Sequence, residues 1–236
     1  MTGMIRKATI FVALGLVAAV SVATAGTPSP ANCIWPAYFD VYACKLSVPD
    51  PLNAVNPPNP TFLNRVFIGD IGNNGVPGAI VKLRFCTDVK LYNAVPGFPA
   101  HVVTCSPSQV AVPTDVTGYA QFYLVGATVN GNPNGNPVGT GAGCISVYVV
   151  INGVDVLLGT ATATVFDQNG ANGGVQRVES TDLSAWLGDF GKTGIIGYKG
   201  RSDYNHNGSI GSTDLGVWLK VFGLGNSAAA CGTLCP

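Results

Sequence analysis

The chain has little charge and few of the side chains that usually carry out catalysis. Of its 236 residues 10% are charged, with 12 basic and 12 acidic side chains, and only two are histidines. No run or stripe of lysine and arginine is present, which argues against a nucleic-acid partner. The sequence also lacks G-x-S-x-G, H-E-x-x-H and phosphate-loop motifs. We therefore predict a protein that is not an enzyme and does not bind nucleic acid.

The few acidic residues are poorly distributed for acid–base chemistry. Six of the twelve lie between Asp167 and Asp214, which leaves six for the rest of the chain. A glycosidase needs two carboxylates that face one sugar, and the first two thirds of the sequence offers no evident pair. Asp70 stands in a Gly/Asn turn, and His101 precedes two valines as an ordinary strand residue would.

Residues 1–25 have the features of a secretory signal. Arg6 and Lys7 form a positive start, residues 8–22 are apolar, and Ala23-Thr24-Ala25 is a small-residue cleavage site. The apolar run is short for a membrane span, and no later segment could cross a bilayer. We expect a bacterial protein that is secreted or held at the cell surface. Without Arg6 and Lys7, ten basic and twelve acidic side chains remain, a formal charge of −2.

Cysteine is abundant for a chain of this length, and all seven cysteines follow the signal. In an oxidising compartment most of them should form disulfides. Their spacing does not determine the pairing, and the odd count leaves one thiol free or intermolecular. The candidates are Cys33, Cys44, Cys86, Cys105, Cys144, Cys231 and Cys235.

The first two thirds of the mature chain should be extended. Residues 26–58 form a Pro-rich lead, in which 33–48 could pair as a first strand. Residues 59–166 hold short β-type runs and no helical period, and Asn152-Gly153 is a strong hairpin signal. The expected strands are 61–68, 79–86, 101–105, 119–125, 144–151 and 154–165. Such a pattern predicts a mainly β fold with an antiparallel β-sandwich.

Two short motifs in this region resemble bacterial Ig-like repeats. Residues 114–122 read T-D-x-x-G-x-A-x-F, and Val76-Pro77-Gly78 precedes an alternating strand. The resemblance implies an Ig-like sandwich over residues 59–166. It also implies an alternative function, adhesion to carbohydrate or to a surface through that domain.

A repeated segment follows the β region. Ser180–Gly191 and Ser212–Gly223 match at eight of twelve positions with an offset of 32 residues. In each copy four large apolar residues recur at the spacing of one helix face; they are Leu183, Trp186, Leu187 and Phe190, then Leu215, Trp218, Leu219 and Phe222. Ser180 and Ser212 are expected as N-caps, and Asp182 and Asp214 in the first turn. We predict two helices that bury these stripes against each other.

The second copy is preceded by a calcium-type loop. Oxygen-bearing residues stand at loop positions 1, 3, 5 and 12, a backbone carbonyl is available at 7, and Gly208 at position 6 allows a sharp turn. The predicted ligands are Asp203, Asn205, Asn207, the carbonyl of Ser209, and Asp214. The alternative is a turn rich in Asn and Gly that binds no metal. Ile210 at position 8 is expected to pair with the other loop.

The loop before the first copy is less regular. Asp167, Asn169 and Asp182 are its candidate ligands, but Asp182 follows Asp167 by fifteen residues instead of eleven. Four extra residues must be held between Gly170 and Gln176. The three side chains converge if the insertion bulges outward; otherwise the copy retains only its helix.

The loops and helices together resemble the dockerin family, whose members carry two calcium-binding F-hand units on secreted bacterial proteins. The resemblance covers residues 167–224, leaving a cysteine-containing tail at 225–236, and the insertion and the glycine-rich connector 191–200 depart from the family pattern. It implies bound Ca²⁺, and a cohesin-like partner recognised by Ser180, Thr181, Ser212 and Thr213. We predict a secreted, non-catalytic protein of extracellular structure or assembly. The alternatives are attachment to a cohesin-like receptor and adhesion; self-assembly is the other possible partnership.

Overall fold

The computed structural model describes residues 26–42, 64–87, 89–93, 101–128, 144–168, 178–193, 200–222 and 234–235. The predicted signal at 1–25, and Cys44, Asn169 and Cys231, lie outside these ranges. The elements in chain order are η1 (Pro30–Asn32), β1 (Tyr38–Tyr42), β2 (Arg65–Phe67), β3 (Ile80–Phe85), β4 (Val89–Leu91), β5 (Val102–Cys105), β6 (Ser108–Pro113), β7 (Tyr119–Gln121), β8 (Leu124–Thr128), β9 (Ile145–Ile151), β10 (Val154–Val165), α1 (Ser180–Leu187), η2 (Gly200–Ser202) and α2 (Ser212–Val221).

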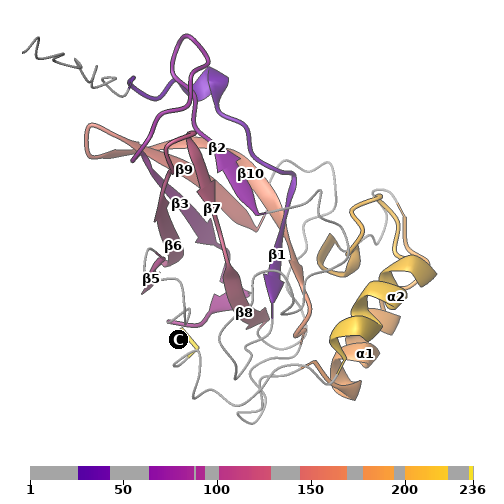
Figure 1. Cartoon of the computed structure of the whole chain (residues 1–236). Helices are drawn as coiled ribbons and strands as arrows, with labels where there is room; N and C mark the ends of the chain where they lie inside the picture. Colours follow the sequence, from indigo (N-terminus) through magenta and orange to yellow (C-terminus); the bar gives the residue numbers. More distant parts are fainter. Residues whose placement is uncertain are drawn as a thin grey trace, which may run out of the picture.

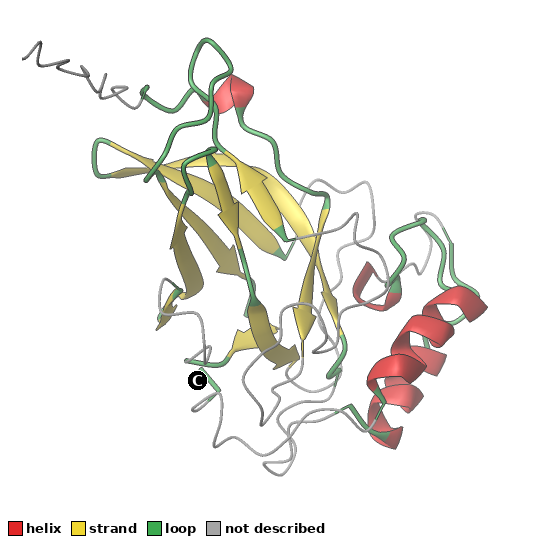
Figure 2. Cartoon of the chain, viewed as in Figure 1, coloured by secondary structure: helices red, strands yellow, loops and turns green. Residues whose placement is uncertain are grey.

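One mixed eight-stranded sheet dominates the fold, with strand order β4-β8-β1-β10-β9-β3-β6-β5 (Figures 1 and 2). Strand β1 lies between β8 and β10 and runs parallel to both, while the other neighbours are antiparallel. A two-stranded sheet, β2-β7, accompanies it. The expected Ig-like antiparallel β-sandwich is therefore wrong. The sheet is curled towards a barrel: its edge strand β4 comes close to β6, which is next to the opposite edge.

The parallel strand explains why the fold was mispredicted. Asp40 stands in the middle of β1 and is almost fully buried, which alternation alone does not suggest. Its main chain is fixed by Asn64, whose side-chain oxygen accepts from Asp40 N at 2.9 Å and whose amide donates to Asp40 O at 2.8 Å. Thr164 on the neighbouring β10 donates to the Asp40 carboxylate. These partners are distant in sequence, so no local pattern reveals them.

Most predicted strands exist, with different bounds. The β9–β10 hairpin turns at Asn152 and Gly153, with φ of +52° and +79°, as the Asn-Gly signal predicts. The expected run 119–125 divides into β7 and β8, which belong to different sheets. Strands β4 and β6 were not anticipated. The described residues between 64 and 168 contain no helix, as expected.

The core lies inside the curled sheet. Alternate residues of the strands point inward; they include Phe39, Val41, Val66, Val81, Leu83, Val110, Val112, Phe122, Leu124, Val147 and Val149. The T-D-x-x-G motif makes a tight turn beside it: Asp115 accepts from the backbone N–H of Thr117 and of Tyr119, and Gly118 has φ of +85°. A methyl group on Gly118 would overlap the main chain of Gly75, so only glycine fits there.

Two disulfides join described cysteines, consistent with an oxidising, extracellular compartment. Cys86 pairs with Cys144, and Cys105 at the end of β5 pairs with Cys235. Cys33 is a buried free thiol. Leu234 forms a β-bridge with Tyr92 just beyond β4, so residues 234–235 connect the two edges of the sheet. No helix within the described ranges is long and apolar enough to cross a bilayer.

The repeated segments form the two predicted helices, which lie beside the sheet (Figure 1). Their shared core contains Trp186 and Trp218, both fully buried, together with Phe166, Val178, Tyr204, Ile210 and Val221. The expected four-residue stripes are only partly buried. Leu187, Phe190, Leu219 and Phe222 are 57%, 51%, 55% and 47% exposed. The helices pack largely on residues from the loops and from the end of β10, and this turns the second half of each stripe outward.

Candidate metal centre

The predicted loop before α2, residues 203–214, is compact and closes on itself (loop 2). Asp203 accepts at one carboxylate oxygen from Asn207 N, at 3.1 Å, and at the other from Gly208 N, at 2.8 Å. Gly208 has φ of +82°, the left-handed conformation expected at position 6. Asn205 Oδ1 accepts from Asn207 N at 3.1 Å. Asn207 Oδ1 in turn accepts from Ser209 N at 2.9 Å.

Asp214 joins the end of loop 2 to its beginning. Its carboxylate accepts from Asn205 N at 3.0 Å and from Gly211 N at 2.9 Å. The contact with Gly211 caps α2, because Gly211 is the residue before the helix. Asp203 and Asp214 are both fully buried. Burial raises the pKa of Asp214, and the nearby charge of Asp203 raises it further.

The side chains of loop 2 offer oxygens of the kinds that a calcium ion prefers. Calcium prefers carboxylate, amide and carbonyl oxygens, and each such oxygen has more than one lone pair. The carboxylates of Asp203 and Asp214 lie close enough to repel, which a divalent cation between them would relieve. Within the described part of the chain, no three His, Cys, Asp or Glu side chains are grouped to hold a metal ion. Loop 2 offers two carboxylates, those of Asp203 and Asp214, and its remaining donors would be Asn and main-chain oxygens.

The loop before α1 begins in the same way (loop 1, residues 167–182). Asp182 accepts from Gln168 N at 2.6 Å and from Glu179 N at 2.8 Å. The second contact caps α1, as Asp214 caps α2. Asp167 is fully buried and close enough to Tyr92 to raise the pKa of that hydroxyl, after the larger effect of burial. The structure thus brings Asp182 back to the residue beside Asp167, while Asn169 lies outside the described residues.

Two local expectations need correction. Ser180 and Ser212 are the first helical residues, and the N-cap positions belong to Glu179 and Gly211. Asp182 and Asp214 perform the capping that was assigned to the serines. The main chain of Ile210 pairs with Gly191 and Lys192 after α1, at 2.8 and 3.0 Å. Ile210 and its counterpart Val178 are both buried in the same core.

The predicted partner-binding residues are on the surface. Ser180, Thr181, Ser212 and Thr213 are all exposed at the starts of the two helices. Thr181 donates to Glu179 at 3.1 Å, and Thr213 accepts from the side-chain amide of Asn205 at 2.7 Å. The structure therefore places these two equivalent pairs on the surface, and gives each threonine a local hydrogen bond.

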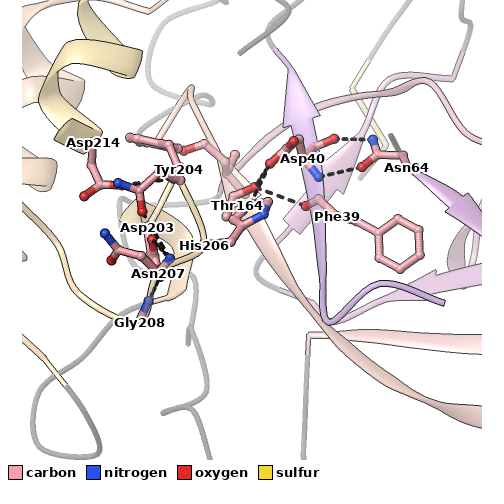
Figure 3. Close-up of polar contacts among 12 residues, drawn as sticks. Phe39, Asp40, Asn64, Thr164, Asp203, Tyr204, His206, Asn207, Gly208 and Asp214 are labelled. Atoms are coloured by element: carbon pink, nitrogen blue, oxygen red, sulfur yellow. Dashed lines mark hydrogen bonds and ion pairs between the residues drawn. The ribbon is translucent and has the colours of Figure 1, made fainter. Parts of the chain in front are cut away.

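Sequence reasoning missed the residues that hold loop 2 against the sheet. His206 at loop position 4 stacks on Tyr38, with ring centroids 4.5 Å apart and an interplanar angle of 8°. Its Nε2 lies 3.2 Å from Asp40 Oδ1 (Figure 3). The available signal was the alternation Tyr38-Phe-Asp40-Val-Tyr42, which places polar and aromatic groups on one face of a strand.

Polar side chains also join the beginnings of the two loops. The Gln168 amide donates to the hydroxyl of Tyr204 and to Ser202 Oγ, both at 2.9 Å. The Tyr204 hydroxyl donates to the Val165 carbonyl at 3.2 Å. Near the end of α1, a buried ion pair links Asp189 to Arg201 Nε at 2.6 Å. The loops, the helices and the end of β10 therefore share one packed unit.

Comparison of the chain with protein-family models, with curated proteins and with solved structures found no match.

Proposed function

We propose that the chain is a secreted, non-catalytic structural protein whose C-terminal unit is stabilised by calcium at loop 2. The observation that carries the proposal is the geometry of Asp203 and Asp214. Both carboxylates are buried, both are oriented by backbone N–H groups, and they face the same short loop. A cation there would offset their repulsion, so its binding energy would contribute to folding.

The proposed role in extracellular structure or assembly rests on how the C-terminal unit is attached. In a module that only tethers its chain to a receptor, the loop–helix unit is free to move on a linker. Here Tyr204 and His206 contact the sheet, and Phe166 at the end of β10 lies in the core of the helix pair. This favours a unit that is part of its own protein's architecture, and the dockerin-like resemblance supplies the calcium chemistry.

Attachment to a cohesin-like receptor remains the second candidate. The observation that favours it is the exposure of matching residues in the two copies, Ser180-Thr181 with Leu187 and Ser212-Thr213 with Leu219. Size-exclusion chromatography of the calcium-loaded protein separates the two functions. Assembly that increases with protein concentration supports the structural role, and a persistent monomer favours the receptor.

Calcium removal tests the metal itself. At a free calcium concentration about 100-fold above the Kd, binding stabilises the folded state by about 2.7 kcal/mol. For a chain of this size that corresponds to about 5–10 °C in melting temperature. Calorimetry of the mature chain in calcium and in EDTA measures this shift, with magnesium at the same ionic strength as the control. An identical melting temperature in calcium and in EDTA would contradict the proposal.

A further inference from the structure

Strand β1 divides its side chains between two tasks. Phe39 and Val41 point into the core of the sheet and are fully buried. Tyr38, Asp40 and Tyr42 face the other way, towards the C-terminal unit, where His206 and Phe166 contact them. The outer face of one strand is therefore the surface on which loop 2 rests.

Asp40 is held too firmly to follow movements of the loop. Asn64 fixes its main chain with two hydrogen bonds, at 2.8 and 2.9 Å. Thr164 donates to the same carboxylate oxygen that lies 3.2 Å from His206 Nε2. Figure 3 shows these contacts in sequence from Asn64 to His206, with Asp203, Asn207 and Asp214 on the loop side. The arrangement gives His206 a rigid docking point.

Two positions of loop 2 contact the sheet. His206 at position 4 stacks on Tyr38, and only 2% of its side chain is exposed. Tyr204 at position 2 stacks on Phe166, with centroids 4.5 Å apart, and Phe166 stacks on Tyr42 at 5.8 Å. The candidate ligands occupy positions 1, 3 and 5, which are next to these two positions in the chain. Docking of positions 2 and 4 therefore constrains the backbone that carries the ligands at 1, 3 and 5.

The backbone at position 4 does not by itself require histidine. His206 has φ of +58°, in the left-handed region. Asparagine and glycine adopt that conformation readily. The imidazole is therefore accounted for by its contacts with Tyr38 and Asp40, and not by the turn.

We propose that His206 is a positioning residue for calcium: by docking on Tyr38 and Asp40 it pre-orders loop 2, so that strand β1 sets the affinity of a metal site more than 160 residues away in sequence. The inference rests on the proposed calcium function. A loop that is already ordered loses less conformational entropy when the ion binds. The coupling is reciprocal, so calcium must also strengthen the contact between loop 2 and β1.

The test compares calcium affinity in the full mature chain and its variants. His206→Asn keeps a residue suited to the left-handed turn but removes the ring. We expect its Kd for calcium, measured from amide chemical shifts during titration with CaCl₂, to rise about tenfold. Tyr38→Ala should weaken binding similarly, whereas Tyr38→Phe keeps the stacked ring and should bind like the wild type. The double variant His206→Asn/Tyr38→Ala should lose little more calcium affinity than either single variant.

Two further measurements separate positioning from general destabilisation. Val81→Ala removes buried volume from β3, away from loop 2, and should lower the melting temperature without changing the Kd. In the absence of calcium, the Gly208 amide, which donates to Asp203 at 2.8 Å, should exchange with solvent faster in His206→Asn than in the wild type.

Each result has a definite meaning. Equal calcium affinity in the wild type, His206→Asn and Tyr38→Ala overturns the inference and leaves the calcium function standing. No binding by the wild type at millimolar calcium overturns the calcium function, and the inference with it. A loss of affinity in Val81→Ala as large as in His206→Asn also overturns it, because general destabilisation would then explain the effect.

Discussion

Loop 1 continues directly from the sheet, whereas loop 2 rests on the sheet through side chains. Asp167 follows β10 by two residues, and its carbonyl accepts from Thr128 N of β8 at 3.1 Å. The Thr128 hydroxyl also donates to the carbonyl of Gln168. In loop 2, by contrast, the contacts with the sheet are made by the rings of Tyr204 and His206.

The helical halves of the two copies are nearly equivalent despite this difference. Asp182 and Asp214 each cap their own helix and reach back to the start of their own loop. Trp186 and Trp218 are equally buried. The helix and its capping aspartate are thus specified within the repeat. How each loop contacts the sheet depends instead on the segment that precedes the loop. One motif can therefore be attached to a sheet by main chain or by side chain.

The largest expected effect tests the equivalence of the helices. Trp186→Ala and Trp218→Ala should each lower the free energy of unfolding by about 3–5 kcal/mol, because each removes a fully buried indole from a shared core. Urea denaturation followed by circular dichroism, with the disulfides intact, measures the loss. If one variant loses less than half as much free energy of unfolding as the other, the two copies are not equivalent in packing.

The next effect tests the inequality of the loops. Asp203→Asn should remove most of the calcium-dependent rise in melting temperature, and Asp167→Asn should leave most of it, because loop 1 contains four additional residues whose ordering opposes binding. Each variant is compared with itself in EDTA, so any calcium-independent loss of stability cancels. A greater loss of the calcium response in Asp167→Asn would reverse the assignment of the stronger site.

The smallest effect concerns the outer halves of the helices. Leu187→Ser and Leu219→Ser change equivalent side chains that are 57% and 55% exposed. Each should alter the free energy of unfolding of the isolated protein by no more than about 0.5 kcal/mol. Urea titration checks this, and a loss above about 2 kcal/mol would mean that these side chains are buried against another part of the protein or a second copy.

The sequence specified those features that depend on neighbouring residues. The Asn152-Gly153 hairpin follows from two residues that accept positive φ, and the starts of α1 and α2 follow from the repeated Ser-Thr-Asp-Leu. The turn in loop 2 was predicted because Gly208, which has φ of +82°, and the two aspartates lie within twelve residues of one another. In each case the determining contacts are local.

Features that depend on distant contacts were mispredicted or missed. Asp40 can be buried in a parallel strand because Asn64 and Thr164 form hydrogen bonds with it. Neither residue is near Asp40 in sequence. Phe190 and Phe222 are exposed because the helices pack on a core that includes Phe166 and Tyr204. A helical period cannot reveal which residues outside the helix it packs on. For the same reason the contacts of His206 with Tyr38 and Asp40 were missed.

The Cys105–Cys235 disulfide has a mechanical consequence. It spans 130 residues, and loop 1, loop 2 and both helices lie inside the covalent loop that it closes. If tension is applied between Gly26 and Cys235, the shortest covalent path runs along residues 26–105 and then across the sulfur bridge. Residues 106–234 carry no load on that path. The two helices and the two loops are therefore shielded from stretching for as long as the disulfide is intact, and reduction would expose them to force.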